Sequence, residues 1–236
     1  EIAQCLVGSE MCIRDRSGAD PKLLGCWSVC GNSAEQEFQK YTDKQDKSSL
    51  EAGFMWQKTT RESKKYQLRG EILSFIPVEK NVEVMLVTIT NTGRMAQTVT
   101  PTAAIPLYGR SADNIRDHRH VTSLLHRIET TDIGVLVTPT LSFDERGHQV
   151  NHMTYYCVGW SGNGEKPVDF YPTAEDFVGE GGNFERPYAI VKNAEGVKAG
   201  TRIEGLEAVG GLHFSEVTLE PEEECSYLIF TGITED

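Results

Sequence analysis

The amino-acid sequence predicts an all-β domain, a β-sandwich of two large antiparallel sheets with one or two short peripheral helices. Short segments rich in β-branched and aromatic residues recur about every ten to fifteen residues, separated by Gly, Pro or Asn turn signals. Helical patterning is confined to two short stretches. Many short strands and few helices favour two packed sheets around one hydrophobic core.

The expected elements begin after an irregular segment at residues 17–33. A short helix is expected over 33–47, because Ser33 and Gln36 have the spacing of a capping box. Strands are expected wherever alternating apolar residues end in turn signals. These segments are 54–60, 66–78, 81–91, 97–105, 121–129, 134–141 and 153–160.

The segment 81–91 differs from the others because it is apolar on both sides. Met85, Val87 and Ile89 fall on one face of an extended chain. Val84 and Leu86 fall on the opposite face. A strand of this kind is expected in the centre of a packed sheet.

The last third of the chain is richer in Gly and charge. Residues 167–211 are interpreted as a long excursion with one short helix near 185–192. Two strands, 214–219 and 226–231, flank the acidic stretch LEPEEE. We expect this stretch to be a turn that joins two antiparallel neighbours.

The amino-terminal residues are treated separately from the domain. Residues 5–16, CLVGSEMCIRDR, resemble a translated sequencing-adapter read-through, and the alternative is a short amphipathic lead-in. We therefore interpret 1–16 as an artefact and 17–236 as one domain.

The composition excludes several classes of partner. The formal net charge of −12 disfavours nucleic acid and anionic membranes, which bind basic surfaces. No apolar run approaches the roughly 20 residues of a membrane span. Six cysteines are too few for a disulfide scaffold in a chain of 236 residues. A cytoplasmic protein with reduced thiols is expected.

The segment from Tyr108 to His120 carries an unusual concentration of hydrogen-bonding groups. Arg, Asp and Asn side chains pair with vicinal hydroxyls or with phosphate in fixed geometry, so a loop of this composition predicts a sugar or phosphate ligand. Tyr108 would stack on a pyranose face. The candidate substrate-binding residues are Tyr108, Arg110, Asp113, Asn114, Arg116, Asp117, His118 and Arg119. The alternative is a salt-bridge network that serves only the neighbouring turns.

Other candidate sites are interpreted as structural. His118, His120 and His126, and the pair His148 and His152, lack the remaining ligands of a metal site. Cys26 and Cys30 have neither redox nor zinc spacing, and Cys157 and Cys225 fit core packing. The glycines 179, 181 and 182 indicate a turn rather than a phosphate loop.

Two further sets of side chains could suggest carbohydrate chemistry. Asp144 and Glu145 are adjacent, so in an extended chain they point to opposite sides and cannot flank one glycosidic bond. Trp56, Trp160 and Phe170 could form an aromatic platform for sugar, although each is also a common core residue. The sequence does not separate these two roles.

Four stretches of the sequence share a longer pattern: NVEVMLVTITNTG, TAAIPLYGRSADNIRDHRHVTSLLHRI, LSFDERGH and DFVGEGGNFERP. They resemble the amino-terminal β-sandwich of the inverting glycoside phosphorylases, the cellobiose- and chitobiose-phosphorylase group of glycoside hydrolase family 94. Within that group the 1,2-β-oligoglucan phosphorylases are the nearest match. The resemblance spans about residues 25–236 and implies a galactose mutarotase-like β-supersandwich.

The resemblance also implies an activity for the whole enzyme. Family members split a β-glucoside with inorganic phosphate to give α-glucose 1-phosphate, without another cofactor. Their general acid is an aspartate on a separate (α/α)6 barrel, so no catalytic residue is carried over to this chain. We expect a non-catalytic domain that meets β-glucan and phosphate through the barrel and takes part in a homodimer. A cyclic β-glucan synthase would share the same sandwich. A carbohydrate-binding module and a purely structural domain remain alternatives.

Overall fold

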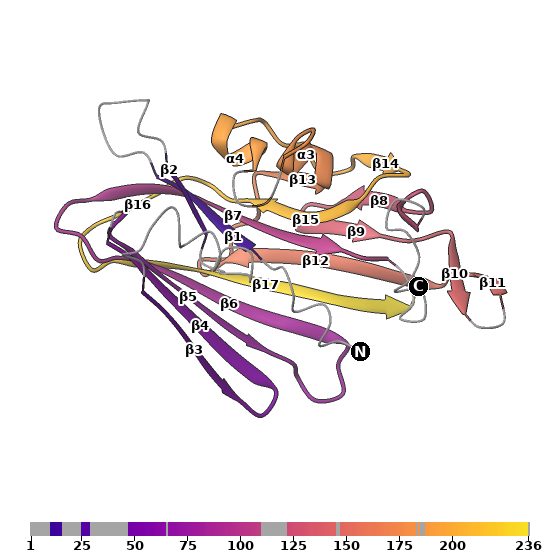
Figure 1. Ribbon diagram of the computed structural model, residues 1–236, viewed down its shortest axis with the longest axis horizontal. Helices are drawn as coiled ribbons and strands as arrows, with labels where there is room; N and C mark the ends of the chain where they lie inside the picture. Colours follow the sequence, from indigo (N-terminus) through magenta and orange to yellow (C-terminus); the bar gives the residue numbers. More distant parts are fainter. Residues whose placement is uncertain are drawn as a thin grey trace.

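The computed structural model describes residues 10–15, 25–28, 47–64, 66–109, 122–144, 147–182, 184 and 187–235. These residues form large antiparallel sheets with two short helices beside them, which confirms the predicted all-β class (Figure 1). The expected helix over 33–47 falls mostly outside this part of the chain, and Lys47 already belongs to a strand.

The larger sheet has nine antiparallel strands and is called the nine-stranded sheet below. Its centre is formed by strands from opposite ends of the sequence, because β17 pairs with both β12 and β6. In spatial order the strands are β14 (Arg202–Glu204), β8 (Arg127–Thr130), β9 (Gly134–Val137), β12 (Met153–Ser161), β17 (Glu224–Glu235), β6 (Val82–Asn91), β5 (Leu68–Phe75), β4 (Trp56–Ser63) and β3 (Lys47–Gly53).

The second sheet has six strands and is called the six-stranded sheet. Its path is β13 (Asp169–Thr173), β15 (Ala208–His213), β7 (Gln97–Leu107), β1 (Glu10–Asp15) and β2 (Gly25–Ser28), and β16 (Val217–Leu219) also pairs with β7. A separate hairpin joins β10 (Leu141–Asp144) to β11 (Gly147–Val150). The main hydrophobic core contains residues of both large sheets, among them Ile89, Val99, Val135, Leu212 and Ile229.

Two five-residue helices cover the outer face of the six-stranded sheet. Helix α3 (Ala174–Val178) begins at Thr173, whose hydroxyl accepts a hydrogen bond from the Asp176 backbone amide at 3.1 Å. Helix α4 (Tyr188–Lys192) ends at Asn193 in the left-handed conformation, with φ of 51°. Phe177 of α3 is fully buried in a second core with Tyr171, Ile190 and Val209. The helices therefore seal a face that the strands leave apolar.

Strand β6 confirms the prediction made for a segment that is apolar on both sides. Met85, Val87 and Ile89 are buried in the main core. Val84 and Leu86 point to the other side of the sheet. The strand lies between β17 and β5, well away from either edge.

Three expectations about the strands are wrong. The segment 121–129 is not one strand, because residues 122–125 form a helical turn and the strand begins only at Arg127. The excursion 167–211 contains the core strand β13 and much of β15, as well as the helix expected near 185–192. The acidic stretch after Leu219 does not join neighbours, because β16 and β17 belong to different sheets. Local alternation reports neither which strands pair nor how segments pack in the tertiary structure, so it did not reveal these features.

The amino-terminal stretch interpreted as an artefact overlaps a strand. The backbone of Glu10–Asp15 forms β1, which pairs with β7 on one side and with β2 on the other. The interpretation of residues 1–16 stays a prediction.

Candidate functional site

The predicted ligand-binding loop leaves the sandwich at the end of β7. Tyr108 and Gly109 follow β7 directly, and the described chain resumes at Thr122. Arg110, Asp113, Asn114, Arg116, Asp117, His118 and Arg119 lie outside the described residues, so their placement remains a prediction. The structure describes the base of the loop, at Tyr108, Gly109 and Thr122.

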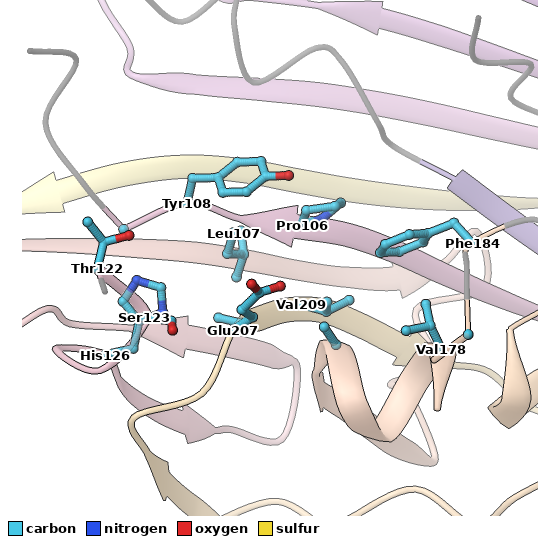
Figure 2. Close-up of a pocket in the computed structure, with 14 residues that line it drawn as sticks. Pro106, Leu107, Tyr108, Thr122, Ser123, His126, Val178, Phe184, Glu207 and Val209 are labelled. Atoms are coloured by element: carbon cyan, nitrogen blue, oxygen red, sulfur yellow. The ribbon is translucent and has the colours of Figure 1, made fainter. Parts of the chain in front are cut away.

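A hollow of about 310 Å³ lies at this base (Figure 2). Both ends of the loop contribute to its lining, and so do β15 and α3. The lining residues are Pro106, Leu107, Tyr108, Gly109, Thr122, Ser123, His126, Ala174, Val178, Gly182, Phe184, Glu207, Ala208 and Val209. The volume is at the lower end of the range for small-molecule sites.

The hollow has a polar side and an apolar side. Figure 2 shows Thr122, Ser123 and His126 at one end, with Val178 and Phe184 at the other. The Glu207 carboxylate lies between these two ends, and the ring of Tyr108 lies above it in this view. A ring with both apolar and hydroxylated surfaces, such as a pyranose, matches a lining of this kind.

Strand pairing brings Glu207 to the loop. Ala208 and Val209 of β15 pair with Leu107 and Pro106 of β7, so the residue just before β15 meets the residues just after β7. The carbonyl of Glu207 accepts a hydrogen bond from the Ala174 amide at 2.9 Å. This bond connects the strand to the start of α3.

His126 holds the base of the loop together. Its ring is buried, with 4% of its surface exposed. Nδ1 donates a hydrogen bond to the Leu206 carbonyl at 3.1 Å, and the backbone carbonyl accepts one from Gly205 at 3.0 Å. Nε2 is buried and makes no hydrogen bond to the described residues. His126 thus links the helical turn at 122–125 to the approach of β15.

The environment of His126 keeps the imidazole neutral. Burial lowers its pKa, because the charged form would lose hydration. The carbonyl partners and the negative charge of Glu207 act in the opposite direction and are smaller causes. In the neutral ring, Nδ1 carries the proton that is donated to the Leu206 carbonyl.

Gly109 is needed at the base because the chain passes close to its neighbours. A Cβ atom at this position would lie 2.7 Å from Cγ of Pro139 and 3.2 Å from Nε2 of His126. Proline is rigid, so the clash could not be relieved by a side-chain rotation. The approach of loop and histidine therefore depends on a residue without a side chain.

A second hollow, of about 430 Å³, lies beside α3 and α4. Its lining includes the carboxylates of Glu175, Asp176, Glu180 and Glu195. Phosphate would be repelled by so many negative charges. The hollow at the loop base, whose lining has one acidic residue, Glu207, is therefore the better candidate of the two for an anionic ligand.

Two other groups of sequence candidates can be located in the described part of the chain. Cys157 is fully buried, and burial raises its pKa to about 12, which makes it an unreactive thiol. Gly179 ends α3 with φ of 80° and Gly181 has φ of 66°, as expected for turns. Within the described residues, no three His, Cys, Asp or Glu side chains are grouped to hold a metal ion.

The three residues of the possible aromatic platform are not brought together. Phe170 is buried in the main core. Trp56 and Trp160 lie on the outer face of the nine-stranded sheet, on the separate strands β4 and β12. Asp144 belongs to the β10–β11 hairpin, and Glu145 lies outside the described residues.

Several lining residues were not identified as ligand-binding from the sequence. His126 was considered only as a metal ligand, and Thr122, Ser123, Phe184 and Glu207 were not singled out. Glu207 had no local signal, since its position depends on the pairing of β15 with β7. The expectation that a binding site starts at Tyr108 could be made from loop composition alone.

The fold and the hollow together define a large β-sandwich protein with a ligand-sized site at the root of a polar loop. The family model for the glycosyl hydrolase 94 supersandwich domain matches residues 26–236. The chain therefore belongs to this family. No curated protein sequence matches the chain significantly. Neither described helix is long and apolar enough to cross a membrane.

Proposed function

We propose that this chain serves as the non-catalytic sandwich domain of an inverting glycoside phosphorylase. The enzyme would cleave β-linked gluco-oligosaccharides with inorganic phosphate and release α-glucose 1-phosphate, with β-1,2 linkages as the preferred substrate. The domain would shape the sugar and phosphate pocket and take part in a dimer interface. Family membership and the hollow at the root of the 108–120 loop support this role.

The chemistry of the loop root supports a sugar on the domain side of the pocket. Tyr108 is 42% exposed, and the exposed part of its ring would stack on a pyranose face. Apolar side chains of β7, β15 and α3 lie beside the Glu207 carboxylate, which can accept hydrogen bonds from hydroxyl groups. Arg110 and Arg116 would supply charged donors to phosphate or to hydroxyls.

A kinetic test would use a full-length phosphorylase of this family that carries this domain. R110A and R116A should each lower kcat/KM for phosphate about tenfold, because a hydrogen bond to a charged group contributes roughly 1.5–3 kcal/mol. The matched control is R202A, an exposed arginine of β14 that pairs with Glu129. Unchanged kinetics for both loop variants would reject the pocket role and favour a purely structural domain.

A carbohydrate-binding module is the second candidate, because Tyr108 and Trp56 are both exposed aromatic residues. Calorimetric titration of the chain with β-1,2-glucan distinguishes it from the dependent domain. Saturable heat that is lost in W56A would support a binding module. A flat titration would leave the dependent domain as the better description.

The proposed location is the cytoplasm. Cys157 and Cys225 are both free thiols, which is usual in a reducing compartment. Fractionation of cells that produce the protein would test this assignment.

A further inference from the structure

The inner face of β6 carries an acidic residue, Glu83, next to apolar residues of the main core. Met85, Val87 and Ile89 lie on the same face of this strand and belong to the core. Glu83 is buried almost as deeply as they are, with 3% of its surface exposed. Glutamate is rarely buried to this extent unless a positive charge pairs with it.

Strand register surrounds Glu83 with uncharged side chains. Thr231 of β17 is its direct neighbour, and Cys157 of β12 and Val135 of β9 continue the same row. Burial raises the pKa of Cys157 to about 12, so this thiol is neutral. On the other side of β6, Ser74 of β5 is buried one row along, opposite Met85. None of these neighbours carries a positive charge.

The six-stranded sheet packs closely against this row. The Cys157 thiol donates a hydrogen bond to the Gly210 carbonyl of β15 at 3.6 Å. A Cβ atom on Gly210 would lie 2.2 Å from Cβ of Cys157, so the two sheets have no spare room here. Tyr155 is the other titratable side chain on this face of β12. The core residues contributed by β7 and β15 are apolar: Val99, Ala103, Ile105, Leu107, Ala208 and Leu212.

The hydrogen bonds of the Glu83 carboxyl group are incomplete. The Ser74 hydroxyl bonds to it, but the buried Oε1 atom makes no hydrogen bond to the described residues. Burial raises the pKa of Glu83, and the bond from Ser74 lowers it by a smaller amount. An ionised carboxylate with an unpaired oxygen costs much more free energy in such a place than the neutral acid does.

We propose that Glu83 is a pH-sensitive switch, neutral while it is packed in the core and ionised only when the β5–β6 end of the sandwich opens to water. Glu83 is the second residue of β6, and the turn before it contains the exposed Lys80. This turn is the nearest exposed stretch along the chain. The Ile233 amide donates a hydrogen bond to the Asn81 carbonyl at 3.1 Å, which closes this end against β17. Opening of the end should break this bond and bring the carboxylate to water.

The switch acts as pH rises. The unfolded chain releases the Glu83 proton near the ordinary glutamate pKa of 4.5, whereas the folded chain releases it at higher pH. The stability contributed by the neutral acid is therefore present below pH 4.5 and is lost as pH rises through the folded pKa. His126 acts in the opposite direction, because its pKa is lowered by burial. A comparison of two chains that differ only at Glu83 cancels the contribution of His126.

Thermal unfolding of the unchanged chain and of E83Q, at about pH 5 and about pH 9, tests the switch. Glutamine keeps the shape of the side chain but cannot ionise. The Tm of E83Q should therefore rise relative to that of the unchanged chain by at least about 3 °C between the two pH values. The matched control is E51Q, at an exposed position of β3, which should show no such rise.

Hydrogen exchange tests where the chain opens. After correction for the intrinsic exchange rate, the amides of residues 81–85 and 229–233 should lose protection at least about tenfold between pH 5 and pH 9. E83Q should keep this protection, because its side chain stays neutral at both pH values. Protection that does not change with pH in the unchanged chain would contradict the opening.

The remaining outcomes also decide the inference. A Tm difference between E83Q and the unchanged chain that is equal at both pH values overturns it. If E83Q does not fold, carboxyl carbon-13 NMR of the unchanged chain, labelled at glutamate, replaces it. One glutamate resonance should then titrate at higher pH than the others, and its absence would overturn the switch. Sugar and phosphate are absent from these measurements, so their result leaves the R110A and R116A test unaffected.

Discussion

The outer faces of the two sheets differ in what covers them. On the six-stranded sheet, α3 and α4 bury Tyr171 and Val209 under Phe177. On the nine-stranded sheet, Trp56, Phe75 and Leu228 remain more than one-third exposed. Both faces are apolar, so strand composition does not separate them. The difference lies in where the chain between β13 and β15 passes.

This difference also explains the position of the candidate site. Helix α3 contributes Ala174 and Val178 to the hollow, and β7 and β15 contribute the wall beneath them. The hollow forms where the helical cover of the six-stranded sheet meets the root of the polar loop. An apolar face covered by the chain itself thus provides a small enclosed site, whereas an uncovered face provides a broad surface.

The largest expected effect on stability comes from a change on the outer face of the six-stranded sheet, which α3 and α4 cover. F177A should lower the free energy of unfolding by about 3–5 kcal/mol, because it removes a fully buried ring and leaves a cavity between α3 and β13. Urea denaturation followed by fluorescence would measure it. The matched change on the outer face of the nine-stranded sheet, W56A, should lower the free energy of unfolding by less than about 1 kcal/mol. Equal losses for the two variants would contradict the distinction between the faces.

A smaller effect is expected in the pH dependence of stability, through His126, which lines the hollow beside α3. The pKa of His126 is lowered in the folded state by burial, from its ordinary value of 6.5. The unfolded chain therefore binds a proton first as pH falls, and stability decreases from about pH 7 down to the folded pKa. Below that pKa the contribution of His126 to the slope vanishes.

Unfolding free energies measured between pH 8 and pH 5 would test this dependence. H126Q should flatten this part of the profile, because the group whose pKa is lowered by burial is removed. The control is H152Q, at an exposed loop position, which should keep the slope of the unchanged protein. A slope that survives H126Q would mean that other groups cause the pH dependence.

The smallest effect is expected from the ion pair between Lys58 and Glu71, on the outer face of the nine-stranded sheet. The hydrogen bond to Glu71 raises the pKa of Lys58, and the same bond lowers the pKa of Glu71. Solvent screens both side chains, so K58A should change the unfolding free energy of the monomer by at most a few tenths of a kcal/mol. A loss above about 1 kcal/mol in thermal unfolding would show that this side of the sheet contributes more stability than its exposure indicates.

The sequence predicted where most strands lie, but it did not predict which strands pair with one another. Alternation located most of the strands and identified β6 as central, because residues on both its faces are apolar. The strands β13 and β15 lie in a stretch with much Gly and charge, so local patterning did not reveal them. The sheet assignment of β16 and β17 could not be predicted either, since the same acidic connection could join neighbours or cross between sheets.

The candidate site was predictable in part. Loop composition singled out Tyr108, which lines the hollow, and the family resemblance suggested the kind of ligand. His126 and Glu207 meet there only because β15 pairs with β7, a contact between residues distant in sequence. Such a contact leaves no periodic signal along the chain.

The sequence by itself determined the all-β class, the family and the apolar residues on both faces of β6, since these depend on residue types and their spacing. Only the tertiary structure decided which apolar face the chain covers, and where β15 brings a carboxylate to the polar loop. The physical reason is that burial and proximity arise from long-range strand pairing, whereas composition and alternation are local.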